Sequence, residues 1–262
     1  MPRSHLQDFM PRLPAELTDR VIDHLHADHL TLATCSLVCK TWLPASRHHL
    51  FEITKICLTE INIHSFVKLL NSPTTSTFFG HALNVSINVG EHRSARSIFD
   101  TLSHHLFRLK IKSLKLESMM WDIDEKREEL FEYFAKIPTL ELHNVAFQFQ
   151  GSPPRYTNSK IQFLKFITSF LSLERLHLDG IFILEPDVPF TLPPLLRFVH
   201  LNMATHSMAP YLSSVQWPPL SSLTISHIRR EDMGAIQAVL ESLGSSLHDL
   251  TISFARLRAY IS

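Results

Sequence analysis

Leu173–Asp179, LERLHLD, and Leu220–Ser226, LSSLTIS, share a pattern in which one apolar residue is followed by others three and five positions later. The same spacing begins at Ile111, Leu196 and Leu247. Its last two apolar residues are separated and flanked by mostly polar ones, and such alternation is typical of a β-strand with one buried face. These stretches therefore predict short, half-buried strands.

Eight apolar pairs of this kind follow one another along the chain. They are Ile56/Leu58, Val85/Ile87, Leu114/Leu116, Leu140/Leu142, Leu176/Leu178, Val199/Leu201, Leu223/Ile225 and Leu250/Ile252. Their first members lie 29, 29, 26, 36, 23, 24 and 27 residues apart. Of the 24 residues immediately before, between and after the pair members, only Cys57 and Phe198 are apolar, which supports strands with one wet face.

Amphipathic stretches between these pairs predict helices. The expected helices are Ser65–Leu70, Ser94–Leu106, Glu125–Ile137, Ser159–Leu171, Ser207–Val215 and Glu231–Leu243. Prolines stand just before several strands, where the lack of an N–H does not interrupt a ladder. The longest spacing, before Leu176, contains GSPPRYTNS (151–159), which predicts a protruding loop.

The chain before the first pair has a different, helical pattern over Leu13–Phe51, LPAELTDRVIDHLHADHLTLATCSLVCKTWLPASRHHLF. Pro14 suits the first turn of a helix, which then presents Leu17, Val21, Ile22 and Leu25 on one face. Three short helices are expected here. Their apolar residues either all face the following domain or in part meet a partner, and the residues alone leave both arrangements open.

The remaining two helices of this stretch are predicted from capping residues. Asp28 is a suitable N-cap for the second helix, and Ser36 for a third that carries Leu37 to Leu43. Pro44 is then expected at the end of the third helix or in its last turn.

This stretch resembles the F-box motif. The resemblance lies in Leu13-Pro14-x-Glu16-Leu17, the pair Val21-Ile22, Leu25, Leu30 and Leu37-Val38-Cys39-Lys40-x-Trp42, with Thr18 as a departure where many F-boxes have leucine. It implies binding to the Skp-type adaptor of cullin–RING ubiquitin ligases. The implied adaptor-binding residues, whose division between adaptor contact and module core stays open, are Leu13, Pro14, Leu17, Ile22, Leu25, Leu30, Leu37, Val38 and Trp42.

The following region is similar to leucine-rich repeats, whose units of about 20–29 residues carry one strand and one helix. The family's asparagine is absent, and its positions hold Ile61, Gly90, Met119, Val145, Ile181, Ala204, Ile228 and Ala255. The backbone groups that asparagine satisfies need other partners, so an irregular curve is expected. Apolar residues continue to Ile261, so either a last helix closes the solenoid or the sequence is truncated.

The resulting expectation is an α/β chain of a fungal-type F-box and leucine-rich-repeat protein. The resemblances imply a tail over residues 1–12, a three-helix F-box over 13–51, and an irregular solenoid of short parallel strands and helices over 52–262, with its end either closed by a last helix or truncated.

Composition narrows the function classes. The 262 residues hold 25 Lys plus Arg and 25 Asp plus Glu, which argues against a nucleic-acid surface. The sequence has neither an apolar run of 18 residues nor an N-terminal hydrophobic signal core, so no membrane partner and a cytoplasmic or nuclear location are expected. Three cysteines with no second CxxC-type pair favour buried free thiols.

Catalytic and metal-binding patterns are weak. His24 and His26 project about 200° apart on a helix and do not converge. His143, His177 and His200 fall on the wet face of separate strands, where each taken singly reads as polar surface. The sequence shows no glycine-rich phosphate loop and no nucleophile beside a base. No metal, no cofactor and no enzymatic activity of the chain are therefore expected.

The resemblances imply a substrate-receptor subunit of an SCF-type ubiquitin ligase that binds the Skp adaptor, and through it a cullin, and holds an unidentified target protein. Target contact is expected on the polar strand face, at Lys115, Glu117, Glu141, Arg175, His177, Asp179, His200 and Asn202. The alternative is a non-ligase scaffold that binds proteins through the solenoid.

Overall fold

The computed structural model describes residues 14–53, 55–72, 82–90, 93–122, 128–147, 157–181, 190–202, 212 and 215–255. The helices are α1 Ala15–His24, α2 His29–Val38, α3 Leu43–Ile53, α4 Ile63–Leu70, α5 Arg96–Leu106, α6 Glu128–Phe134, α7 Thr157–Thr168 and α9 Met233–Leu243. The strands are β1 Lys55–Leu58, β2 Ala82–Asn88, β3 Lys110–Trp121, β4 Thr139–Phe147, β5 Arg175–Asp179, β6 Phe190–Thr191, β7 Phe198–Asn202, β8 Val215–Gln216, β9 Ser222–Ile228 and β10 Asp249–Phe254.

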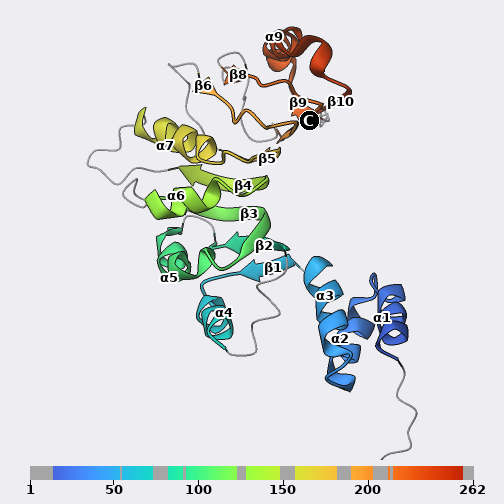
Figure 1. The fold of residues 1–262 in the computed structure, drawn as a ribbon. Helices are drawn as coiled ribbons and strands as arrows, with labels where there is room; N and C mark the ends of the chain where they lie inside the picture. Colours follow the sequence, from blue (N-terminus) through green and yellow to red (C-terminus); the bar gives the residue numbers. More distant parts are fainter. Residues whose placement is uncertain are drawn as a thin grey trace, which may run out of the picture.

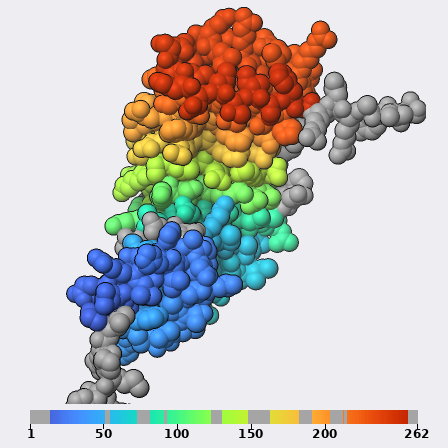
Figure 2. Space-filling view, turned by 90° about the vertical axis from the view of Figure 1, so that its right-hand side faces the viewer, coloured from blue at the N-terminus to red at the C-terminus, as the bar shows by residue number. Residues whose placement is uncertain are grey.

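Eight of the strands form one parallel sheet in the order β1-β2-β3-β4-β5-β7-β9-β10. All eight predicted apolar pairs lie in this sheet, and the first members pair with one another across every neighbouring strand, from Ile56↔Val85 to Leu223↔Leu250. The order follows the chain, as the run of colours along the molecule shows (Figures 1 and 2). The fold class is therefore α/β with a parallel sheet.

Helices α4 to α7 lie along the same side of this sheet (Figure 1). Their apolar faces and the strand pairs form one continuous core that runs from Leu58 to Leu243. Alternation therefore works as predicted, because the pair members point toward the helices and the residues between them point to the other face. The last strand departs from this pattern, since Leu250 and Ile252 of β10 are 45% and 36% exposed.

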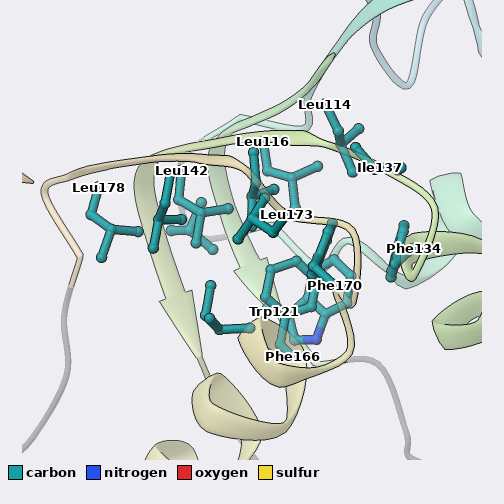
Figure 3. Close-up of a cluster of buried hydrophobic side chains, with 14 of the residues drawn as sticks. Leu114, Leu116, Trp121, Phe134, Ile137, Leu142, Phe166, Phe170, Leu173 and Leu178 are labelled. Carbon is teal, nitrogen blue, oxygen red and sulfur yellow. The ribbon is translucent and has the colours of Figure 1, made fainter. Parts of the chain in front are cut away.

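Aromatic side chains fill the middle of the core (Figure 3). Trp121, at the end of β3, is fully buried, and its ring centroid lies 4.3 Å from that of Phe166 and 5.2 Å from that of Phe99. Phe134 and Phe170 stack with their ring centroids 5.2 Å apart and their planes only 7° from parallel. These contacts join strands β3 and β4 to helices α5, α6 and α7.

Helices α1, α2 and α3 form an N-terminal unit with its own small core, which we call the helical module. Ile22, Leu32 and Cys35 are buried, and none of them belongs to the continuous core of the sheet. Asp28 caps α2 as predicted, because its carboxylate accepts a hydrogen bond from the backbone N–H of Thr31 at 3.1 Å. His49 of α3 contacts Asp23 of α1 at 2.7 Å and ties the two helices together.

Several sequence-based boundaries are wrong. Ser36, Leu37 and Val38 lie in the last turns of α2, and Pro44 stands in the first turn of α3 rather than at its end. The first turn suits proline, because the N–H groups there have no partner within the helix, whereas in the last turn proline would remove a helical hydrogen bond. Residues 157–159 begin α7 instead of belonging to a loop. The predicted helix Ser207–Val215 lies mostly outside the described residues, and Val215 begins β8.

The structure contains a short ladder that was not predicted, and it corrects the prediction for the cysteines. Strands β6 and β8 form a small parallel ladder of their own, too short for any periodicity to mark them in the sequence. All three cysteines are free, but only Cys35 is buried, so the expectation of buried thiols is wrong for Cys39 and Cys57. Within the described part of the chain, none of the helices is long and apolar enough to cross a membrane.

Candidate functional site

The helical module exposes a set of large apolar side chains. Leu37 is 86% exposed, Leu30 83% and Val38 59%, and on α2 the positions 30, 37 and 38 share one side because they are seven and eight residues apart. Pro14, Leu17 and Val21 are exposed on α1. We call these six residues the apolar surface of the module.

The structure divides the predicted adaptor-binding residues between this surface and the interior. Pro14, Leu17, Leu30, Leu37 and Val38 are exposed, Leu25 and Trp42 are half-buried, and Leu13 lies outside the described residues. Ile22 is fully buried, so its assignment to adaptor contact is corrected: it points into the core of the module.

Thr18 also points inward, and its hydroxyl donates to the Pro14 carbonyl at 3.2 Å. The polar side chain at this buried position is thereby satisfied within its own helix. Its difference from leucine does not alter the apolar surface of the module.

The second candidate surface is the polar face of the sheet, on the side opposite the core. Its middle row is Lys115, Glu141, His177, His200 and Thr224, and the next row is Glu117, His143, Asp179, Asn202 and Ser226. All eight predicted target-binding residues lie on this face, because the register aligns them strand by strand.

A shallow hollow of about 250 Å³ crosses β4, β5, β7 and β9 on this face. Four of the predicted residues, Glu141, Arg175, His177 and His200, line it, whereas Lys115, Glu117, Asp179 and Asn202 do not. Phe198 also lines it and carries the Arg175 guanidinium 4.4 Å above its ring. The prediction omitted Phe198 as an apolar exception to the alternation, although its position placed it on this face.

Four side chains on β4 and β5 form a tight polar cluster, which we call the β4–β5 cluster: Glu141, His143, His177 and Asp179. His143 Nδ1 lies 3.3 Å from an Asp179 carboxylate oxygen, and His143 Nε2 lies 3.7 Å from a Glu141 carboxylate oxygen. The His143 and His177 rings meet edge to face at 4.6 Å. His177 then stacks on His200 of β7 with 4.1 Å between centroids and 7° between planes.

The electrostatics of the cluster follow from its burial and its charges. The neighbouring His143 side chain is the main cause that lowers the pKa of the Glu141 carboxyl. Burial, followed by the proximity of His200 and His143, lowers the pKa of His177 to about 4. Burial also lowers the pKa of His200. His177 and His200 are therefore neutral near pH 7, which permits their parallel stacking without repulsion between charges.

The prediction from the sequence placed these histidines on one face of the sheet but interpreted each of them separately as polar surface. The signal that joins them is the alignment of Glu141-x-His143 with His177-x-Asp179 in consecutive strands, which becomes visible when the repeats are written one beneath another.

No protein-family model and no curated protein matches this chain.

Proposed function

We propose that this chain is a substrate-receptor subunit of an SCF-type cullin–RING ubiquitin ligase. Its helical module binds a Skp-type adaptor, and its repeat sheet, arranged as an irregular leucine-rich-repeat solenoid, holds a target protein on the polar face. The observation that carries the proposal is the exposure of Leu30, Leu37 and Val38 at positions of the F-box-like pattern.

Their exposure supports a protein partner on physical grounds. Side chains of this size are normally buried, and a cluster of them on a surface marks an interaction site. Ile22, Leu32 and Cys35 form the core of the module. Leu30, Leu37 and Val38 do not take part in that core and remain exposed. A partner that covered them would remove apolar area from water, at roughly 25 cal/mol per Å² of area buried.

In this role the chain would carry out no bond chemistry itself. It would raise the effective concentration of a target lysine beside the ubiquitin-charged enzyme, which is catalysis by proximity. The hollow across β4, β5, β7 and β9, with Arg175, Glu141 and the stacked histidines, supports the polar face as the place of target contact.

The test is direct association between the purified chain and a purified Skp-type adaptor, measured by calorimetry. We expect binding by the intact chain and its loss in Leu37→Glu, because a charge would enter an apolar interface. Leu171→Glu is the matched control, since Leu171 is 62% exposed beyond α7 and outside the module. Failure of the folded intact chain to bind would refute adaptor binding and favour a stand-alone scaffold. Equal binding by Leu37→Glu would refute the assignment of the adaptor contact to the apolar surface of the module.

A further inference from the structure

One ring nitrogen of His143 has a hydrogen-bond partner and the other has none in the described structure. Nδ1 lies 3.3 Å from Asp179 Oδ2, within reach of a hydrogen bond that it donates to the carboxylate. Nε2 is buried and has no hydrogen-bond partner in the described structure. A buried polar atom without a partner calls for an explanation.

His143 Nε2 lies close to the Glu141 carboxylate oxygen Oε2, which is an electron-pair donor and cannot donate a hydrogen bond. The donor atoms of Glu141, His143 and His177 all lie within 4.8 Å of one another. Glu141 Oε2, the donor at 3.7 Å from His143 Nε2, is an acceptor like the deprotonated nitrogen itself. Lone pairs that approach one another in this way are stabilised by an electron-pair acceptor between them, and a metal ion is one such acceptor.

We propose that Glu141, His143 and His177 bind a divalent transition-metal ion of the zinc class, with Asp179 orienting His143 from behind. Two imidazoles and one carboxylate are ligands that suit zinc, and three protein ligands leave a fourth position open. This inference concerns the sheet alone and does not depend on adaptor binding.

The geometry of the backbone suits the site. Glu141 and His143 are two apart on β4, His177 lies beside Glu141 on β5, and Asp179 lies beside His143. A tetrahedral ion with bonds of about 2.0–2.1 Å needs its ligand atoms roughly 3.3 Å apart. The separations are 3.7 Å for the one pair and up to 4.8 Å for the set, so the side chains would have to rotate toward the ion to reach that value.

The Asp179 contact is the second reason to favour a metal ion. Histidines that bind metals usually donate their other N–H to a carboxylate, which sets the tautomer and the ring orientation. Asp179 stands in that position behind His143. We do not count His200 among the ligands. Its ring stacks flat on that of His177, and its Nε2 lies 3.4 Å from Ser226 Oγ.

The experiment is a titration of the chelator-treated full chain with Co²⁺, followed by the visible absorption of the bound ion and by displacement with Zn²⁺. We expect one equivalent of Co²⁺ with the intense absorption of a four-coordinate site, and tighter binding of Zn²⁺ in line with the stability order of these ions. His143→Asn and His177→Asn should each abolish this absorption. Asp179→Asn should weaken affinity about 10- to 100-fold while leaving the absorption in place.

The chain has 17 histidines, so a matched control is needed. His248→Asn serves as that control, since His248 is exposed beside β10 and its Nδ1 contacts the carbonyl of Ser246 at 2.9 Å. It should bind Co²⁺ like the unchanged chain. Circular dichroism of each variant verifies folding, and Glu141→Gln, which keeps the size of its side chain, provides a further ligand variant. Absence of the absorption in the folded unchanged chain, or its persistence in both folded histidine variants, would overturn the proposal and leave His143 as a polar contact between Glu141 and Asp179.

Discussion

Gly180 has a left-handed backbone conformation that recurs after the apolar pairs of several strands. It follows β5 with φ +62°, and Ser118 within β3, Asn144 within β4 and His227 within β9 adopt similar positive φ angles of 50°, 51° and 61°. In each case the residue stands two positions after the second apolar residue of its pair. A left-handed residue therefore recurs at this place in the repeat and turns the chain out of the pleat.

Gly180→Ala should destabilise the protein by about 1–2 kcal/mol, because an L side chain is strained in the left-handed region. Its Cβ would also meet the Asn144 side-chain oxygen. Gly234→Ala in α9 is the control, since a Cβ there has open space and alanine favours helix by up to about 1 kcal/mol. Urea unfolding of both variants measures the difference, and equal stability of the two would show that the turn tolerates a side chain.

At the scale of the element, the aromatic layer between strands and helices is the part of the core with least room for change. Trp121→Ala should lower the free energy of unfolding by about 3–5 kcal/mol, as for other large aromatic truncations in cores. Trp121 is fully buried, and its ring contacts Phe99 and Phe166. Leu171→Ala, at a 62% exposed position, should change stability by less than about 0.5 kcal/mol. Thermal and urea unfolding compare them, and a small loss for Trp121→Ala would mean that neighbouring rings refill the space.

The helical module separates residues that hold it together from residues that face outward. Ile22→Ala should cost about 2–5 kcal/mol within the module, because Ile22 is fully buried. Leu37→Ala should be nearly neutral for folding. Hydrogen exchange of the amides in α1 to α3 measures this locally. Faster exchange in Leu37→Ala than in Ile22→Ala would reverse the division of the two residues between surface and core.

The sequence predicted the strands far better than the helix ends, for a physical reason. A two-residue alternation is local and survives in every repeat, so all eight apolar pairs were found, and they lie in the eight strands of the sheet. The third helix was misplaced because Pro44 was assigned to its end, although proline suits the first turn of a helix. At four of the eight positions of the missing repeat asparagine the residues are buried in the core, namely Met119, Val145, Ile181 and Ile228, whereas Ile61 at another is 93% exposed.

The β4–β5 cluster shows what local patterns omit. Glu141 and His143 could be placed on the polar face from the alternation alone, but their approach to His177 and Asp179 depends on pairing across the longest connection in the chain. The face of each residue was therefore predictable, whereas the neighbour on the next strand required the register.

At the scale of the whole molecule, the two proposed sites lie on different parts of the chain, one on the helical module and the other on the polar face of the sheet. The module joins the sheet at β1, and β4 lies three strands further along, about 14 Å at roughly 4.8 Å per strand. Figure 1 shows the module beside the β1 end, away from β4 and β5. Groups more than about 7–10 Å apart without shared partners usually contribute independently.

Adaptor binding and metal binding should therefore be energetically independent. We expect Leu37→Glu to leave Co²⁺ affinity unchanged and His143→Asn to leave adaptor affinity unchanged, each within about 0.5 kcal/mol, because neither residue contacts the other site. Calorimetry of both variants with both ligands, completed by the double variant, measures the coupling. A coupling free energy above about 1 kcal/mol would show that the sheet transmits strain from β4 to the module, and the two sites would then have to be treated as one linked system.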